Sequence, residues 1–220
     1  MRRSRDHHEA GPAKDGHPIF AALYDPIGAS AERRWMGERR RRLLTGAWGA
    51  VLEIGGGTGA NLQHYRDVDR VIVAEPDPFM RKRLGPKLGD ARVHVEVSTA
   101  GAEALPFPDG SFDTVVSTLV LCTVPDQESA LDEVRRILRP GGRLLFIEHV
   151  RAAGPIGRWQ DRLDPLWRRL LGGCHPNRDT VTAIEEAGFE IETFESFYPP
   201  GPLSGLTPHV QGSATVRLAA

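Results

Sequence analysis

The sequence predicts an α/β protein in which helices cover both faces of a mostly parallel sheet. From Ala50 onward, short β-branched runs alternate with helix-like stretches. Such alternation favours parallel strands, and right-handed crossovers place helices on both faces. A glycine-rich turn within residues 51–61 (VLEIGGGTGAN) follows the first of these runs. The 220 residues suit one such domain better than two.

The runs and turn signals place the elements along the chain. The expected strands are 50–54, 70–74, 92–97, 114–117, 143–149, 189–198 and 208–218. The expected helices are one or two within 20–44, then 58–65, 78–84, 126–138 and 180–187, with a short turn at 101–105.

We divide the chain into a polar tail, residues 1–17, predicted to be disordered, and a single domain, residues 18–220. Within the domain, 18–49 is an N-terminal helical lid and 50–149 is the core. Residues 150–178 are a helical insertion that serves as a substrate lid. Residues 179–220 hold the last helix and a C-terminal hairpin. The insertion follows the fifth strand, at the edge of the sheet where ligands bind.

Composition limits the function classes. The chain has a net charge of −1, so it does not have the excess of basic residues that is typical of a nucleic-acid-binding protein. Two cysteines are too few for a disulfide framework, and no run approaches the ~20 apolar residues of a membrane span. The arginines at the N-terminus have no apolar run behind them, which excludes a signal peptide. We therefore predict a cytoplasmic protein.

A second group of basic residues lies in the N-terminal helical region, at Arg33, Arg34 and 39–42. One interpretation is a solvated helix face. The other is a surface that makes peripheral contact with acidic lipid or steers an anionic substrate. The sequence does not indicate an oligomeric state.

The glycine-rich turn fits two cofactor patterns. The string G-x-G-x-x-A beginning at Gly55 matches the dinucleotide pattern, and E-x-G-x-G-x-G from Glu53 to Gly59 matches the S-adenosylmethionine (SAM) pattern. Glycine adopts positive φ without strain and lets a ligand approach the backbone closely. Glu75, at the end of the second strand, can accept the ribose hydroxyls of either cofactor.

Three features favour SAM. Glu53 can serve the amino group of a methionine moiety, which NAD does not have. The strings AEALPFPDGSFD (102–113) and LRPGG (138–142) then follow in order. Together these blocks resemble the class I SAM-dependent methyltransferases over residues 51–149. The resemblance implies a Rossmann-like, doubly wound sheet of seven strands in the order 3-2-1-4-5-7-6, with strand 7 antiparallel.

Longer strings narrow the resemblance. AEALPFPDGSFDTVVSTLVLCTVPD resembles the branch of ubiquinone/menaquinone and phospholipid methyltransferases. LVLCTV (119–124), EHV (148–150), GGCH (172–175), RDT (178–180) and PHV (208–210) resemble the methyltransferase-like 7 family, whose mammalian members methylate alkyl thiols. This implies methyl transfer to a small, apolar acceptor, with a thiol as the leading candidate and oxygen, nitrogen and carbon acceptors left open.

The resemblance also assigns cofactor contacts. Those nearest the methionine and ribose are Glu53, Gly55, Gly57 and Gly59, and those at the ribose hydroxyls are Glu75 and Pro76. Ala102 and Glu103 would lie beside the adenine, and Thr118 and Leu119 behind the sulfonium.

Methyl transfer from a sulfonium is an in-line displacement, so the protein mainly positions the reactants and excludes water. No metal is required, and no C-x-x-C or H-E-x-x-H spacing occurs, so no metal site is predicted. The candidate bases are His149 and His175. The alternative for His149 is a side chain at the end of a strand whose hydrogen bonds are satisfied by its neighbours. The alternative for His175 is a loop residue that hydrogen-bonds to the backbone.

Three residues are candidate substrate contacts: Tyr24, Cys174 and Arg178. The alternatives are helix packing for Tyr24, a small buried packing residue for Cys174, and a helix-start ion pair with Asp179 for Arg178.

Two other function classes remain open. An NAD-dependent oxidoreductase would need residues that assist hydride transfer, such as a tyrosine and lysine pair. None of the three tyrosines has a lysine four residues further along the chain. A non-catalytic binding module is the other class, and the intact glycine turn with Glu75 argues against it.

Overall fold

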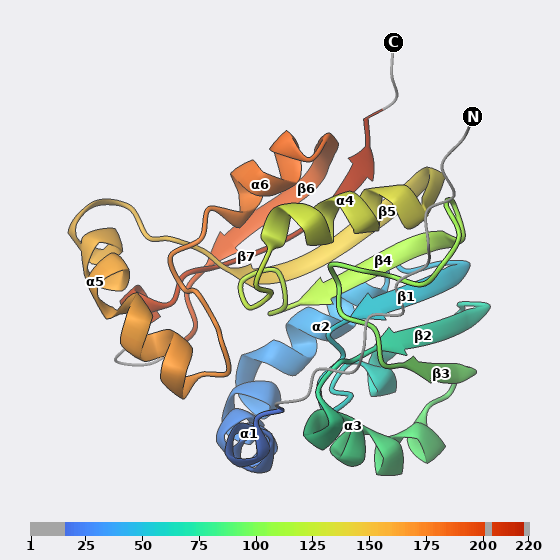
Figure 1. The fold of residues 1–220 in the computed structure, drawn as a ribbon, viewed down its shortest axis with the longest axis horizontal. Helices are drawn as coiled ribbons and strands as arrows, with labels where there is room; N and C mark the ends of the chain where they lie inside the picture. The colour runs from blue at the N-terminus through green and yellow to red at the C-terminus, as the bar shows by residue number, and fades with distance from the viewer. Residues whose placement is uncertain (1–15, 201–203, 218–220) are drawn as a thin grey trace, which may run out of the picture.

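The computed structural model describes residues 16–200 and 204–217. A seven-stranded sheet in the order β3-β2-β1-β4-β5-β7-β6 runs through the middle of the molecule (Figure 1). Strands β1 to β5 are parallel, and β7 is antiparallel to both of its neighbours. The predicted sheet order and the antiparallel seventh strand are confirmed. Only the last two residues of the predicted tail, Gly16 and His17, lie within the described part.

The strand bounds differ from the predictions mainly at their starts. The strands are β1 Ala50–Ile54, β2 Arg70–Ala74, β3 Val95–Ser98, β4 Phe112–Thr118, β5 Leu138–His149, β6 Phe189–Phe197 and β7 His209–Val216. β5 begins earlier than expected because Leu138 pairs with Phe112 before a register shift, and Gly141 takes a φ of +80° in between. β1 and β4 are buried along their whole length, as is usual for parallel strands covered on both faces.

The α-helices are α1 Pro18–Ala31, α2 Gly37–Leu44, α3 Pro78–Leu84, α4 Gln127–Ile137, α5 Gly154–Leu170 and α6 Thr180–Glu186. A π-helical turn, Glu32–Met36, joins α1 to α2, and short 3-10 turns occupy Leu62–His64, Gly85–Asp90 and Ser204–Leu206. The insertion after β5 is thus mainly one 17-residue helix, α5, in agreement with the helical insertion predicted.

Two cores hold the layers together. α4 and α6 cover one face of the sheet, and α2 and α3 lie on the other (Figure 1). On the first face, Leu131 of α4 and Ile184 of α6 are buried in one cluster with strand residues such as Leu52. On the second, Leu44 of α2 and Leu84 of α3 join the alternate strand residues. α1 and α5 lie beyond the carboxyl ends of the parallel strands (Figure 1).

The predicted helix 58–65 is wrong. After the glycine turn the backbone forms successive tight turns and a single 3-10 turn, Leu62–His64. The N–H of Gly59 donates to the carbonyl of Gly56 (2.9 Å), and that of Leu62 donates to Gly59 (3.2 Å). Because these bonds span three residues and Gly59 has a φ of +81°, no α-helix can start here.

No helix within the described residues is long and apolar enough to cross a bilayer.

Gly212 of β7 supplies a test of the hairpin packing. A Cβ at this position would collide with the carbonyl oxygen of Thr193 and approach the Phe146 ring to 2.8 Å. We expect Gly212→Ala to lower the free energy of unfolding by about 1–3 kcal/mol in urea titrations, since the β6 backbone at Thr193 must move away from the added methyl group. Gly85→Ala is the matched control, because nothing lies within 4 Å of its added Cβ. Equal stabilities of the two variants would contradict this packing.

Candidate functional site

The glycine turn after β1 has two packed positions and one open position. Gly55, Gly57 and Gly59 take φ values of +54°, +56° and +81°. A Cβ at Gly55 would meet Val120, and one at Gly59 would meet Leu84, so both glycines permit close packing. Among the described residues, a Cβ at Gly57 would meet only the carbonyl of Gly55, at 4.0 Å. Gly57 therefore leaves backbone open to a ligand.

Glu75 holds this turn from the end of β2. Its carboxylate accepts the N–H of Gly57 (2.7 Å) and the N–H of Asp77 (2.8 Å). Burial raises the pKa of Glu75, and these two backbone hydrogen bonds oppose the shift. Each carboxylate oxygen retains further acceptor capacity, so ribose hydroxyls can still bind here. The next residue, Pro76, is half-buried, and its carbonyl accepts a hydrogen bond from Arg81 (2.7 Å).

Glu53 is buried and has partners within the chain on both oxygens. The Tyr65 hydroxyl donates to Oε2 (2.7 Å), and the Asn61 amide donates to Oε1 (3.1 Å). Burial raises the pKa of Glu53 to about 7, although these hydrogen bonds lower it. Glu53 therefore anchors the segment that follows the glycine turn.

The sequence analysis missed Arg40 as a buried residue, because both of its interpretations placed this group of arginines at the surface. Arg40 is buried on α2, and its Nη1 donates to Asn61 Oδ1 and to Thr118 Oγ1, both at 2.9 Å. Its Nε donates to Glu32 (3.3 Å). Helical spacing carried the signal, since Arg40 lies four residues from both Met36 and Leu44, which are buried.

Most of the other arginines in this group are paired within the chain. Arg39 contacts Glu195 (3.1 Å) and lies over the Phe197 ring, 3.4 Å from its centroid. Arg41 and Arg42 both contact Glu38. The cation density available to an acidic lipid is therefore smaller than the sequence suggests.

Glu103 offers an acceptor on the adenine side predicted from sequence. Its Oε1 is buried without a hydrogen-bond partner among the described residues, and the neighbouring Ala102 is buried as well. A buried carboxylate oxygen without a donor is costly unless a ligand supplies one. The exocyclic amino group of an adenine is such a donor. Together with the open backbone at Gly57 and the carboxylate of Glu75, these residues fit SAM.

Glu148 on β5 organises the loop that follows β4. Its fully buried carboxylate accepts the Ser117 hydroxyl (2.6 Å) and the backbone N–H groups of residues 120–122 (3.1 Å each). Leu119, just before these groups, has a φ of +62°, and its N–H donates to Ile147 (2.8 Å). Strained backbone of this kind persists where surrounding contacts hold it, and it is frequent at functional sites.

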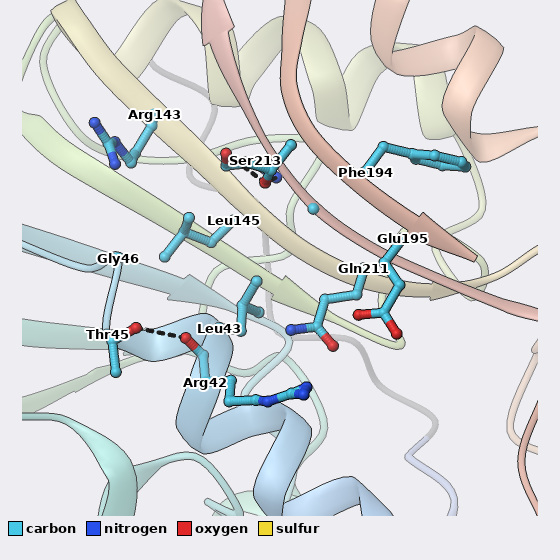
Figure 2. A pocket seen from close by; sticks show the side chains of 12 residues that line it. Arg42, Leu43, Thr45, Gly46, Arg143, Leu145, Phe194, Glu195, Gln211 and Ser213 are labelled. Carbon is cyan, nitrogen blue, oxygen red and sulfur yellow. Dashed lines mark hydrogen bonds between the residues drawn. The ribbon is translucent and has the colours of Figure 1, made fainter. Parts of the chain in front are cut away.

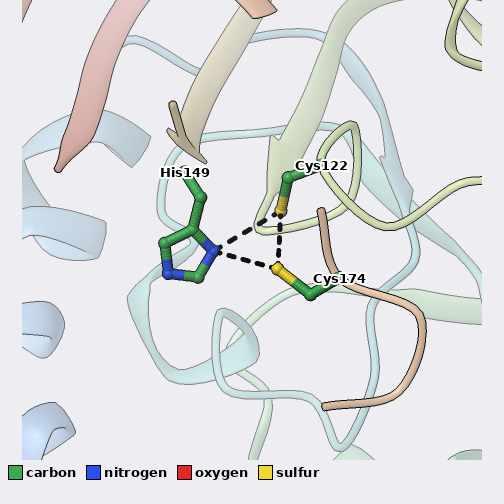
Figure 3. A group of neighbouring side chains, drawn as sticks. All are labelled: Cys122, His149 and Cys174. Carbon is green, nitrogen blue, oxygen red and sulfur yellow. Dashed lines mark hydrogen bonds between the residues drawn. The ribbon is translucent and has the colours of Figure 1, made fainter. Parts of the chain in front are cut away.

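Three segments bring a cysteine–histidine cluster together at the carboxyl edge of the sheet. Figure 3 shows His149 Nδ1 facing the sulfurs of Cys122 and Cys174. The N···S distances are 3.6 Å and 3.3 Å, and the sulfurs are 3.7 Å apart. Cys122 lies in the loop after β4, His149 ends β5, and Cys174 lies before α6. Local spacing in the sequence gives no sign of this cluster.

The two thiols share a hydrogen bond and titrate differently. That bond lowers the pKa of Cys174, and the His149 contact adds to the effect, although burial opposes it. The same bond and burial raise the pKa of Cys122. Cys174, predicted as a substrate contact or a packing residue, is thus buried beside a titratable histidine.

His175 and Arg178 hold the neighbouring loops. The N–H of His175 donates to the Cys122 carbonyl (2.7 Å), and its Nδ1 lies 3.1 Å from Asp164 of α5. Burial lowers the pKa of His175. Arg178 Nη1 donates to the Leu121 carbonyl (2.7 Å). The next residue, Asp179, caps α6 by accepting the N–H of Thr182 (3.2 Å), and no ion pair joins it to Arg178 among the described residues.

The N-terminal helix α1 reaches over the glycine turn. Asp25 accepts hydrogen bonds from the Thr58 hydroxyl and from Lys87 Nζ (3.0 Å). Tyr24 is half-buried and packs edge-to-face on Phe20, with ring centroids 5.5 Å apart. Burial raises the pKa of its phenol. α1 therefore contacts the glycine turn, and its role as a lid stays a prediction.

A hollow of about 320 Å³ lies elsewhere, between α2 and strands β5, β7 and β6. Figure 2 shows its lining, which includes Arg42, Leu145, Phe194 and Gln211. It includes no residue of the glycine turn or the cysteine–histidine cluster, so it is separate from the candidate site.

Comparison with known proteins identifies the family. Residues 52–146 match the family model described as a methyltransferase domain. The human thiol S-methyltransferase TMT1B is 40% identical, over 91% of this chain and 86% of that protein. The chain belongs to the class I SAM-dependent methyltransferases. A ubiquinone/menaquinone C-methyltransferase, UbiE of Enterobacter sp., is 41% identical to this methyltransferase over 66% of the chain and 68% of its own length.

Solved structures agree on the fold. Geranyl diphosphate C-methyltransferase of Streptomyces coelicolor superposes with a TM-score of 0.68 at 16% identity, and the match covers 94% of this chain and 89% of that one. Membership of the methyltransferase family makes SAM the methyl donor of this protein, as predicted.

Removal of the Glu148 carboxylate should unfold the loop after β4. In Glu148→Ala, three backbone N–H groups and the Ser117 hydroxyl lose their acceptor in a buried setting. We expect the free energy of unfolding in urea to fall by about 3 kcal/mol or more. The exposed Glu190→Ala on β6 is the control, and it should stay within about 0.5 kcal/mol of wild type. A comparably small effect at Glu148 would contradict its organising role.

The raised pKa of Glu53 predicts a pH-dependent stability. Folding raises this pKa to about 7, so the folded state binds the proton more tightly than the unfolded chain. The resulting stability is present below about pH 4 and is lost as the pH rises through about 7. Relative to wild type, Glu53→Gln should therefore gain about 3 kcal/mol between about pH 5 and pH 8 in urea titrations. If the free energies of unfolding of wild type and Glu53→Gln changed in parallel with pH, the raised pKa of Glu53 would be refuted.

Proposed function

We propose that this methyltransferase transfers the methyl group of SAM to the thiol of a small, apolar acceptor. The observation that carries the proposal is the similarity to thiol S-methyltransferases. Human TMT1B and TMT1A are 40% and 36% identical over 91% and 89% of the chain. Those matches extend beyond the cofactor-binding core into the segments that surround the acceptor.

The position of the cysteine–histidine cluster also supports a thiol acceptor. Ligands of open α/β sheets bind beyond the carboxyl ends of the strands. At the ends of β4 and β5 lie Leu119 and the cluster of Cys122, His149 and Cys174. We place the acceptor sulfur beside this cluster, with Tyr24 of α1 on the lid side. Its thiol proton must leave before or during attack, because the thiolate is the nucleophile.

The lids offer apolar surface to an apolar acceptor. α1 exposes Ile19, Leu23 and Ile27, which are spaced four residues apart on one side of the helix. α5 exposes Trp159 and Leu170 among other apolar residues. Apolar side chains at the entrance of a site favour ligands with apolar bodies.

The chemistry requires little of the protein beyond placement. SAM supplies a sulfonium-bound methyl group that is already activated for displacement. Glu75, Gly57 and Glu103 fix the position of the nucleoside, and the loop held by Glu148 fixes the acceptor side. Such positioning alone can lower the barrier by roughly 7–11 kcal/mol.

A carbon acceptor is the second candidate. The UbiE relative is a C-methyltransferase, but its match covers 66% of this chain, against 91% for human TMT1B. Peripheral membrane contact and a cytoplasmic location stay predictions.

The acceptor is tested by S-adenosylhomocysteine release with a short alkyl thiol, a phenol, an amine and a quinol of matched size. We expect kcat/KM for the thiol to exceed the others by about tenfold or more, since a thiol ionises most readily near neutral pH. A faster quinol would replace the thiol proposal with C-methylation. Turnover of none of the four would also count against it.

The cofactor site is tested by calorimetric titration with SAM. Glu75→Ala should weaken SAM binding by about 100-fold, because it removes a charged acceptor for two ribose hydroxyls. Glu96→Ala is the matched control, since this exposed carboxylate lies on β3 away from the turn. Unchanged affinity in Glu75→Ala would contradict the assigned role.

A further inference from the structure

We propose that Cys122, His149 and Cys174 bind a zinc ion through three protein ligands and leave a fourth position for an acceptor thiolate. The ligand atoms of these residues all lie within 4.8 Å of one another. Among the described residues this is the one group of three such side chains found. The sequence analysis predicted no metal because it searched only for local ligand spacings, and these ligands come from three separate segments.

The distances fit tetrahedral zinc. With Zn–S near 2.3 Å and Zn–N near 2.05 Å, tetrahedral angles place two sulfurs about 3.8 Å apart and sulfur and nitrogen about 3.6 Å apart. The structure has 3.7 Å between the sulfurs, and 3.6 Å and 3.3 Å from the sulfurs to Nδ1. A disulfide would need the sulfurs near 2.05 Å. Figure 3 shows all three ligand atoms facing one another.

The donor types also fit. Zinc prefers thiolate and imidazole ligands, and soft sulfur donors disfavour magnesium and calcium. Both cysteines are buried, which limits competition from water.

The backbone around the ligands is fixed without the ion. The N–H of Cys122 donates to Glu148 (3.1 Å), and its carbonyl accepts the N–H of His175 (2.7 Å). The N–H of Cys174 donates to Leu171 (3.2 Å). His149 ends β5 and pairs across the ladder with His209 of β7. A site whose ligands are positioned in advance loses little entropy when it binds an ion.

The fourth position links the ion to the proposed thiol methylation, and this part of the inference rests on that proposed function. Zinc sites with three protein ligands are typically catalytic and keep one open position. A thiol that binds there releases its proton to solvent and coordinates as thiolate. Its sulfur then forms the new S–C bond as the methyl–sulfonium bond breaks, and that electron pair stays on the sulfur of S-adenosylhomocysteine. The neutral thioether product is a weak zinc ligand and departs.

The metal site is tested on the full chain without any activity measurement. After dialysis against zinc, elemental analysis should find about one zinc per chain in wild type and about tenfold less in Cys174→Ala. Cobalt substitution should give a thiolate-to-metal charge-transfer band and the visible bands of a tetrahedral ion. The chain has two cysteines, so only this cluster can give a charge-transfer band, whatever its other histidines bind.

The variants separate ligation from folding. Cys122→Ser and His149→Gln keep size and polarity, and each should lose the tetrahedral cobalt spectrum while far-ultraviolet circular dichroism stays native. His94→Ala is the matched control, because this exposed histidine pairs only with Glu96 among the residues that the structure describes. A wild-type protein that takes up no zinc or shows no charge-transfer band overturns the proposal. So does a disulfide between the two cysteines in freshly purified protein.

The fourth position is tested with 2-mercaptoethanol added to the cobalt form. A stronger, shifted charge-transfer band is expected, and an unchanged spectrum overturns the open position. Removal of zinc should slow thiol methylation by about tenfold or more while SAM affinity stays unchanged. Full activity without metal refutes the catalytic role of the ion. Zinc and thiol binding without any thiol methylation would refute the proposed function and leave the metal site standing.

Discussion

The loop after β4, where we propose that the acceptor binds, depends on the buried carboxylate of Glu148. Four hydrogen bonds from Ser117 and residues 120–122 join β5 to the loop after β4. A buried carboxylate is tolerated only when its lone pairs are satisfied, so the loop has few alternatives to this path. The same bonds hold Leu119 at a positive φ and direct Cys122 toward His149. Glu148 on β5 thereby helps to set the place where Cys122, His149 and Cys174 meet.

The side of the site that we assign to the cofactor is joined to a second buried network, which runs from α2 to the end of β4. Arg40 and Asn61 both donate to Thr118, and Asn61 also donates to Glu53. The positive charge of Arg40 opposes the effect of burial on the pKa of Glu53. Because Thr118 and Glu148 both lie next to the loop after β4, the two networks meet at that loop. The N-terminal helices are therefore part of the site's framework.

Local patterns predicted the strands and the glycine turn, because alternation and β-branched runs reflect burial of each strand by itself. The sheet order followed only from the resemblance to the class I methyltransferases. Local patterns failed wherever the conformation or burial of a residue depends on a partner far away in the sequence. The sequence 58–65 looks helical, yet Gly59 and the contacts of Thr58 and Asn61 favour tight turns. From the sequence Arg40 looks solvated, but in the structure its guanidinium is buried and donates to Thr118 at the end of β4. The cluster around His149 joins residues 25 to 52 positions apart, and periodicity carries no signal at that range.

The contacts that attach α5 to the domain are separate from the apolar side chains that this helix exposes. Gln160 is buried on this helix and bonds to the Ala152 N–H (2.7 Å) and to the carbonyls of Pro176 and Leu206 (3.0 and 3.1 Å). These polar contacts join the helix to three loops, whereas its outer face exposes Trp159 and Leu170. Exposed apolar residues can be exchanged without loss of those hydrogen bonds. If α5 lines the proposed acceptor site, new side chains on its outer face change the acceptor preference while Glu148 and the cysteine–histidine cluster keep their places.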